Sequence, residues 1–537
     1  MIKRSLLFFL FSSLLVPAVR SGQPEVKVPL LKKAIWQRPL NLDKDLEEDM
    51  EKAAKATVER ALDTAADEAL APGFLPLLAG KIVVYRTYSD VRAVCLIDEK
   101  QGKDIYTTGD IFFKGTPMDG SLANILSHKD LRVTMETWLN RTFANQRKST
   151  NFLYENTLLG RLTTSHRLVY TVDDLSVPAP QAVFPWMWSQ GLLPGKVKEY
   201  VLGNSLQAFE LATGKFRWRL GNDPENYRHP LDDFTNSHFL GSPLSIGDRL
   251  YALNEKNQGD KDKGGKNSAK GDAELRLVCI DPKQMVDSIR PQVVHPVLSL
   301  GKVPENLRIT HNPVRRISSV ELVHHDGILV CPTNAGKVIG VDIQKMAVRW
   351  TYTYKKEEKK KPGKDEIPVF DARMPIELNR EWRMPGTFLH KDRLVFAAPD
   401  EGSVHCIRVK DGKLIWKAPR KDGLYVAGVF RDKVLVVGAK TCWALALEDG
   451  KEKWTIEAGI PSGKGASHAN VYYLPLRKSA SSGKPGISLI DIAKGKILQT
   501  VDAADGELPG NLLIHQDMLI SQSATHIAAY PLRAGKK

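Results

Sequence analysis

The chain has 537 residues, of which 42% are hydrophobic and 26% charged, and its formal net charge is +15. This length allows three or four ordinary domains or one large repeat architecture, and the apolar fraction is too high for a disordered chain. Five cysteines exclude a small scaffold stapled by disulfides. The basic excess suits an anionic partner such as nucleic acid, an acidic polymer or lipid headgroups, and it has no bearing on the fold.

The N-terminus has the layout of a secretory signal peptide. Two basic residues, Lys3 and Arg4, precede the apolar run 6–16, and a polar break with small residues follows. The run is shorter than the roughly 20 apolar residues that span a bilayer, and no other stretch approaches that length. We therefore expect residues 1–22 to be a signal peptide. The exported protein is expected to be periplasmic or extracellular, with no transmembrane segment and no nucleic-acid partner.

Much of the excess lysine lies in two runs, residues 255–270 and 355–364. Both mix lysine with acidic residues and glycine, and neither has an aromatic side chain that could stack on a base. Solvated insertion loops are the simpler interpretation. Loops that contact an anionic envelope polymer are the alternative.

Residues 41–71 predict one amphipathic helix before the main body of the chain. Its apolar residues recur at steps of three and four, and they are Leu46, Met50, Ala54, Val58, Leu62 and Ala65. Pro72 and Gly73 end the pattern. We expect residues 23–79 to form a helical extension that docks on the body.

From about residue 80 to residue 537 the pattern changes to short β runs separated by turns. Eight apolar strands recur, each followed by a turn and a further strand. They start at Lys81, Arg167, Arg249, Gly327, Arg393, Lys433, Val471 and Asp517. Eight such units predict a repeat architecture of eight similar sheets.

A second repeat follows these strands and combines a glycine turn with a tryptophan. The copies at 208–218, 406–416 and 444–454 keep the same spacing of Gly, Lys and Trp. The copy at 340–350 has Met346 at the glycine position, and the copy at 489–499 keeps its glycine but loses the tryptophan. The glycines are Gly214, Gly412, Gly450 and Gly495, and the tryptophans are Trp218, Trp350, Trp416 and Trp454.

The physical roles of these two residue types are simple. Glycine accepts the positive φ of a tight turn, and tryptophan offers a large flat surface that can pack against a neighbouring sheet. Trp416 and Trp454 are 38 positions apart, which is close to the length of one four-stranded propeller blade. We predict an all-β, eight-bladed β-propeller of four-stranded antiparallel blades with a short N-terminal helical arm. Seven blades remain the alternative, because the copies near Cys95 and Cys279 are degraded.

The repeat resembles the PQQ-like, quinoprotein-type β-propeller repeat. This repeat occurs in quinoprotein dehydrogenases and in the scaffold lipoprotein of the bacterial outer-membrane β-barrel assembly machine. The resemblance covers residues 80–537, and segments such as 239–256 are similar to parts of uncharacterised secreted bacterial propeller proteins. It departs from the repeat at Arg408 and Ala446, which replace an acid, and no cysteine for lipid attachment precedes Cys95.

The resemblance to quinoprotein dehydrogenases implies two adjacent cysteines over a quinone and a calcium site. The cysteines of this chain are all separated from one another, and they are Cys95, Cys279, Cys331, Cys406 and Cys442. Buried, unreactive side chains are the expected role for them, and one long-range disulfide remains the alternative. We expect no cofactor; PQQ with calcium is the alternative.

No metal or catalytic motif emerges from the remaining sequence. The 13 histidines have no metal-ligand spacing, and no nucleophile elbow or phosphate loop occurs. The densest ligand-type cluster, His229 and His238 with two aspartates between them, is predicted to be a polar insertion. The aromatic segment 184–188 is expected to pack on the propeller, with partner or sugar binding as the alternative. We therefore predict no catalytic, cofactor-binding or metal-binding residue.

Three functions follow as hypotheses. The leading one, implied by the resemblance, is a non-enzymatic binding or scaffold propeller of the bacterial cell envelope with protein partners. The rival is a PQQ-dependent oxidoreductase or another enzyme that uses the propeller funnel, and the third is a binder of an anionic polymer. An enzyme predicts converging titratable groups with shifted pKa values in the funnel, whereas a scaffold predicts an apolar surface rim.

Overall fold

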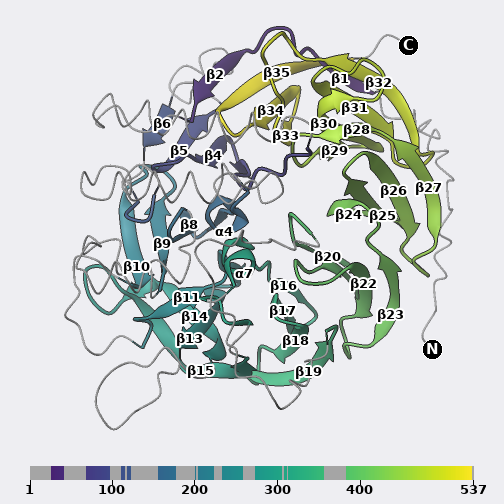
Figure 1. The fold of residues 1–537 in the computed structure, drawn as a ribbon. Coiled ribbons are helices and arrows are strands. Elements are labelled where there is room, and N and C mark those ends of the chain that lie inside the picture. The colour runs from purple at the N-terminus through teal and green to yellow at the C-terminus, as the bar shows by residue number, and fades with distance from the viewer. Residues whose placement is uncertain are drawn as a thin grey trace, which may run out of the picture.

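The computed structural model describes residues 26–40, 68–96, 111–114, 118–121, 155–176, 200, 203–222, 233–257, 273–304, 307–310, 312–355 and 382–534. In these residues the chain forms a ring of eight antiparallel sheets (Figure 1). The predicted all-β, eight-bladed propeller is therefore confirmed, and the seven-bladed alternative is excluded. Each of the eight strands that the sequence predicted is the second strand of one blade. None of the described helices is long and apolar enough to cross a membrane.

Blades 1 to 4 follow one another along the chain. Blade 1 contains β3 (Leu77–Ala79), β4 (Ile82–Arg86), β5 (Val91–Cys95) and β6 (Ile111–Lys114), and blade 2 contains β7 (Thr163–Ser165), β8 (Leu168–Asp173), β9 (Ser205–Glu210) and β10 (Phe216–Gly221). Blade 3 contains β11 (Ser237–Phe239), β12 (Leu244–Ile246), β13 (Arg249–Asn257), β14 (Ala273–Met285) and β15 (Pro291–Val303). Blade 4 contains β16 (Val323–His325), β17 (Ile328–Pro332), β18 (Lys337–Asp342) and β19 (Ala347–Thr353).

Blades 5 to 7 continue the same order. Blade 5 contains β20 (Gly386–His390), β21 (Arg393–Ala397), β22 (Ser403–Arg408) and β23 (Leu414–Pro419), and blade 6 contains β24 (Gly423–Phe430), β25 (Lys433–Gly438), β26 (Thr441–Ala446) and β27 (Glu452–Glu457). Blade 7 contains β28 (Gly459–Pro461), β29 (Ala466–His468), β30 (Val471–Ser479), β31 (Gly486–Asp491) and β32 (Lys496–Asp502).

Blade 8 joins the two ends of the chain. Its strands are β33 (Asn511–His515), β34 (Met518–Gln522) and β35 (His526–Ala534), and they are completed by β1 (Lys27–Pro29) and β2 (Trp36–Pro39). Both N-terminal strands pair antiparallel with β35, and Figure 1 shows them in purple beside the yellow last strand. A ring built in this way leaves no open sheet between its first and last blade. Residues 26–40, assigned from the sequence to an extension, thus form the outer strands of blade 8.

Two short helices lie inside the ring (Figure 1). They are α4 (Thr157–Gly160) and α7 (Pro313–Ile317), and each is capped by an asparagine whose side chain accepts a backbone N–H of the first turn. The predicted helical arm at 41–71 lies mostly outside the described residues. Its last four residues, 68–71, are described and are not helical.

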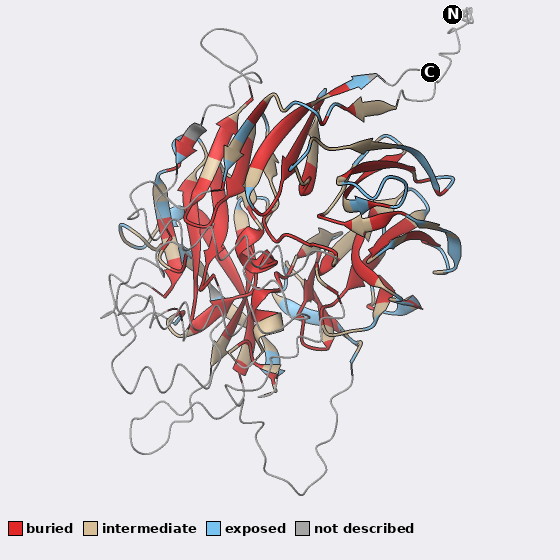
Figure 2. Cartoon of the chain, turned by 45° about the horizontal axis from the view of Figure 1, so that its top comes forward, coloured by how far each residue is buried: buried red, intermediate tan, exposed pale blue. Residues whose placement is uncertain are grey.

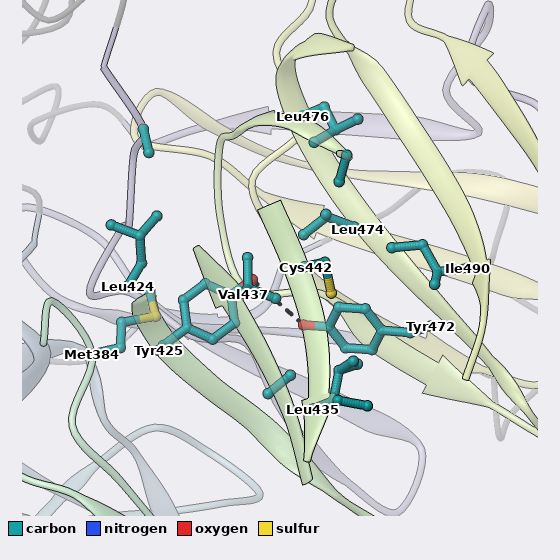
Figure 3. Close-up of a cluster of buried hydrophobic side chains, with 14 of the residues drawn as sticks. Met384, Leu424, Tyr425, Leu435, Val437, Cys442, Tyr472, Leu474, Leu476 and Ile490 are labelled. Carbon is teal, nitrogen blue, oxygen red and sulfur yellow. Dashed lines mark hydrogen bonds between the residues drawn. The ribbon is translucent and has the colours of Figure 1, made fainter. Parts of the chain in front are cut away.

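The core consists of apolar layers between neighbouring blades. Figure 2 shows buried residues along most strands of the ring, with exposed residues concentrated on outer strands and turns. Figure 3 shows one such layer, in which residues of blades 6 and 7 meet around Tyr425 and Tyr472, together with Met384 just before blade 5. The hydroxyls of these two tyrosines lie 3.4 Å apart, within hydrogen-bond distance. Because every blade is covered on both faces by its neighbours, none could bury its apolar surface alone.

Candidate functional site

Three tryptophans on outer strands connect consecutive blades. Each indole Nε1 donates a hydrogen bond to a backbone carbonyl just after the third strand of the next blade. The pairs are Trp350 with Val409 at 2.8 Å, Trp416 with Leu447 at 2.9 Å and Trp454 with Ile492 at 3.1 Å. These three side chains therefore lie at the contact between consecutive blades.

The repeat glycines lie directly against these indoles. Gly412, Gly450 and Gly495 have φ values of +68°, +73° and +64°, which side-chain-bearing residues rarely adopt. A Cβ atom on each would lie 2.5, 2.7 and 2.3 Å from the indole of the preceding blade. Glycine is thus required at each position for two reasons: the backbone conformation has a positive φ, and the indole of the preceding blade lies too close for a side chain.

The first two copies of the motif differ from this pattern. Gly214 has a φ of +69°, but the ring against it is that of Phe113 of blade 1. Trp218 is fully buried next to Tyr170, and its Nε1 has no hydrogen-bond partner. Met346, at the glycine position of blade 4, adopts a φ of +46°, so this turn keeps its left-handed conformation without glycine.

Strand pairing identifies the residue equivalent to these tryptophans in every blade. In each blade, the third residue of the second strand pairs with one residue of the third strand. That third-strand residue also pairs with one residue of the outer strand, on its other side. We call this outer-strand residue the docking residue of the blade. From blade 1 to blade 8 the docking residues are Phe113, Trp218, Val294, Trp350, Trp416, Trp454, Gln499 and Trp36. The docking residue of blade 7, Gln499, is the only polar one.

The residue that pairs with Gln499 is also unusual. Leu489 is the partner in blade 7, whereas the other seven partners are small: Ala93, Ala208, Cys279, Gly340, Cys406, Ala444 and Ala529. A small partner leaves room for a large ring above it, and Leu489 is itself fully buried in the layer between blades 7 and 8. Blade 7 therefore has its bulk on the third strand and a polar side chain on the outer strand.

We call the contact between blade 7 and blade 8 the closing seam. An open groove lies at this seam. Its volume is about 790 Å³, and it runs between residues 499–502 of β32 and residues 29–35, which connect β1 to β2. Blade 8 has no glycine turn here, because its outer strands come from the other end of the chain. Pro531 and Arg533 of β35 complete the lining.

One hydrogen bond crosses the closing seam, and an ion pair within blade 8 holds its acceptor strand. The Tyr473 hydroxyl of blade 7 donates to the backbone carbonyl of Lys27 at 2.7 Å. The Lys27 ammonium pairs with Asp517 at 2.6 Å. Burial raises the pKa of Tyr473 to about 12, so this hydroxyl remains a donor at neutral pH.

The segment 68–76, which we call the plug, is tied to parts of the ring that are far apart in the sequence. Glu155, just before α4, accepts a hydrogen bond from Ala71 N at 3.0 Å, and Arg383, just before blade 5, donates to Ala69 O. In blade 7, Pro461 O accepts from Leu70 N, and in blade 8 Asn511 donates to Pro72 O and Phe74 O. Gly73 lies so close to α4 that a Cβ atom would be 2.3 Å from Asn156 O. The plug is therefore fixed against α4 and against blades 7 and 8.

Side chains from four blades meet near the plug. Arg161, directly after α4, pairs with Glu321 of blade 4. The Lys464 ammonium of blade 7 lies 5.5 Å from the ring centre of Phe388 in blade 5. Burial, and then the charge of Arg161, lowers the pKa of Lys464 to about 8. The Lys464 Nζ donates no hydrogen bond to any described residue.

Buried ion pairs fix the inner helices to the ring. The two consecutive arginines of α7 reach different blades: Arg315 pairs with Glu255 of blade 3, and Arg316 pairs with Asp174 of blade 2. Arg383 pairs with Glu155 at 2.8 Å. Every charge in these pairs has an opposite partner, so the pairs position the insertions over the channel.

One buried carboxylate has a strongly shifted pKa. Asp173 accepts hydrogen bonds from the Tyr200 hydroxyl at 2.7 Å, from Gln207 at 3.1 Å, and from the backbone of Asp119 and Gly120. Burial raises its pKa to about 6, against the opposing effect of Arg86. All of these partners belong to the protein, so the group ties residues 118–121 to blade 2.

The cysteines of the described residues are thiols without a disulfide bond, and four of the five are buried. All five cysteines are free, so the long-range disulfide left open by the sequence does not form. Burial raises the pKa of Cys406 to about 12, which keeps the thiol protonated. His238 is fully buried, and burial followed by Arg316 lowers its pKa. In the described part of the chain, no three ligand-type side chains could hold a metal ion together.

Several predicted features lie outside the described residues. These are the signal peptide at 1–22, the aromatic segment 184–188, His229 and most of the two lysine-rich runs. The sequence had also not identified Trp36, Lys464 or the groove at Gln499. The loss of tryptophan at position 499 was visible in the repeat, and it is the one signal that pointed to the groove.

Comparison with known proteins supports the repeat assignment. Residues 377–536 match the family model PQQ_2, described as outer membrane protein assembly factor BamB. These residues span blades 5 to 8, where the joints of tryptophan and glycine are most regular. The last four blades of this eight-bladed propeller are therefore similar to that family. No curated protein matches the chain.

Two solved structures are similar to this propeller at low identity. BamB from Moraxella catarrhalis is 13% identical, with a TM-score of 0.36, and the match covers 62% of this chain and 78% of that chain. The computationally designed Ika8 protein is 10% identical, with a TM-score of 0.42, and the match covers 86% of this chain and 99% of that chain. With both TM-scores below 0.5, neither likeness supports a conclusion about function.

Proposed function

We propose that this protein is a non-enzymatic binding or scaffold propeller that is exported to the bacterial cell envelope and binds other proteins there. The observation that carries the proposal is a set of exposed apolar side chains on the outer strands of blades 4, 5 and 7. Val348 of β19, Leu414 of β23, and Ile497 and Leu498 of β32 are 38–45% exposed. Val348 and Leu414 lie on consecutive blades, and Ile497 and Leu498 are neighbours on one strand, so each pair offers apolar surface to a partner.

Two further observations support this role. Residues 377–536 match a family whose description names an outer-membrane assembly factor. The apolar start of the sequence, 6–16, supports export.

Site-specific photo-crosslinking in cells that make the protein tests the binding role. A photo-reactive amino acid at Val348 or Leu414 should crosslink to a discrete protein partner, whereas the same amino acid at exposed Lys484, in the β30–β31 turn, should not. Fractionation should place the protein in the envelope, and mass spectrometry should show that residues 1–22 are missing. Retention in the cytoplasm with an intact N-terminus, or equal crosslinking at all three positions, would refute the proposal.

Two groups favour an enzyme as the second candidate. Lys464 has a pKa lowered to about 8, and Asp173 has a pKa raised to about 6, and shifted values are common at catalytic sites. The described residues do not fit the quinoprotein site, because the five cysteines are separate and free. A thermal-shift titration with PQQ, with and without calcium, should therefore leave the melting temperature unchanged. Saturable stabilisation would instead favour the oxidoreductase.

A further inference from the structure

The closing seam lacks the ring that fills the other regular joints. At the three joints between blades 4 and 7, an indole covers the contact and hydrogen-bonds to the next blade. At the closing seam the equivalent residue, Gln499, is exposed and lines an open groove of about 790 Å³. The groove thus lies where the architecture elsewhere places a large aromatic side chain.

The surface of this groove is apolar at its base. Leu31 is buried, Leu30 is 37% exposed, and Ile35 and Val501 are partly buried. These side chains come from the β1–β2 connection and from β32, so they form the two walls of the groove. An aromatic side chain that entered from outside would meet apolar surface on both sides, as Trp454 does one blade earlier.

The rim of the groove carries an excess of positive charge. Lys32, Lys33 and Arg533 line it, and Asp502 is the only acidic lining residue. Both lysines are exposed. Three cations against one carboxylate favour an acidic ligand and disfavour a basic one.

The outer edge of β32 is open next to the groove. Among the strands that the structure describes, β32 pairs only with β31. Its exposed residues include Ile497 and Leu498, which are 38% and 45% exposed. An edge strand with exposed apolar side chains accepts an added strand, and main-chain hydrogen bonds then give affinity while side-chain pockets give specificity.

We propose that the closing seam binds an extended, acidic segment of a partner protein, which adds to the edge of β32 and inserts one aromatic side chain into the groove beside Gln499. This inference rests on the proposed binding role and specifies the chemistry of one partner segment. The aromatic side chain supplies the ring that blade 7 lacks, and the acidic residues on either side pair with Lys32, Lys33 and Arg533.

A fluorescent seven-residue peptide with a central tryptophan, valines on both sides and glutamates at the ends tests the proposal with the full chain. Fluorescence anisotropy should show saturable binding with a dissociation constant below about 100 μM. Replacing the peptide tryptophan by glycine, or its glutamates by lysines, should weaken binding at least tenfold.

Protein variants separate the aromatic and the charge contributions. Gln499→Trp should fill the groove from within and weaken peptide binding at least tenfold, while Gln499→Ala leaves the groove open and keeps binding. Replacing both Lys32 and Lys33 by glutamate should weaken binding about tenfold at low salt and less at high salt. Lys451→Glu, which changes an exposed lysine of the blade 6 turn, should have no effect. The lysine variants test the proposal even if Gln499→Trp does not fold, since both lysines are exposed.

Several outcomes would overturn the proposal. Failure of the wild-type chain to bind the peptide would do so, as would binding that Gln499→Trp and the lysine variants leave unchanged. If the protein self-associates and Gln499→Trp abolishes this, the groove binds a second copy of the chain. If the peptide binds only after residues 1–25 are removed, the groove binds that segment of the chain itself. Crosslinking at Val348 and Leu414 without peptide binding would refute the groove and leave the proposed function standing. Peptide binding without those crosslinks would support the groove and would refute the role of the outer strands of blades 4 and 5.

Discussion

The joint between blades 5 and 6 and the closing seam between blades 7 and 8 both connect neighbouring blades, but they do so with different residues. In the first, Trp416 lies on Gly450 and hydrogen-bonds to Leu447 O. In the second, Gln499 is exposed, and Tyr473 makes the polar contact instead, to Lys27 O. The difference arises because a ring made from one chain needs one blade built from both chain ends. That blade has no hairpin at its outer edge and hence no glycine turn to receive an indole.

The largest expected effect is on the regular joint. Trp416→Ala removes a buried indole and its hydrogen bond, and it should lower the free energy of unfolding by about 3–5 kcal/mol. Urea denaturation followed by circular dichroism measures this change. Gln499→Ala, at the equivalent position of the closing seam, should change it by less than about 0.5 kcal/mol. Equal losses at the two positions would contradict the comparison.

The glycine turn gives a second, smaller effect. Gly450→Ala forces a side chain into a backbone with φ +73° and within 2.7 Å of the Trp416 indole. Gly506→Ala has a similar φ of +80° but meets nothing within 4 Å, so it should cost only the backbone strain of about 1–2 kcal/mol. The loss for Gly450→Ala should exceed that for Gly506→Ala by about 1–3 kcal/mol, the usual effect of overpacking. Calorimetric melting of both variants tests this, and equal losses would mean that the indole can move aside.

The repeat explains why so much of this fold could be predicted from the sequence. Local alternation marked the second strand of every blade, and Gly412, Gly450 and Gly495 marked the turns, because both signals depend on neighbours in the chain. Trp36 carried no such signal: it has no preceding glycine turn, and it pairs with Ala529 at the far end of the chain. Lys464 and Arg161 are separated by 303 positions, so only closure of the ring brings them together.

A third prediction rebuilds the regular joint at the closing seam. Leu489→Ala should destabilise the protein because it opens a cavity in the layer between blades 7 and 8. Adding Gln499→Trp should recover about 1–2 kcal/mol of that loss, since the new indole lies above a small residue as at the other joints. A double-mutant cycle from urea denaturation measures the coupling. If the effects of the two changes are simply additive, the large Leu489 side chain on the third strand does not take the place of the missing indole on the outer strand.

The inner end of blade 7 gives the subtlest test, through the pH dependence of stability. The pKa of Lys464 is lowered to about 8, whereas an unfolded lysine titrates near 10.4. Between these values the unfolded chain binds a proton that the folded chain has lost, so this group makes stability rise with pH from about 8 to 10. The free energy of unfolding of the wild type, relative to that of Lys464→Met, should therefore increase over this range. A constant difference between pH 7 and 10 would mean that Lys464 is well solvated in the folded chain, and the channel end near the plug would then be open to water.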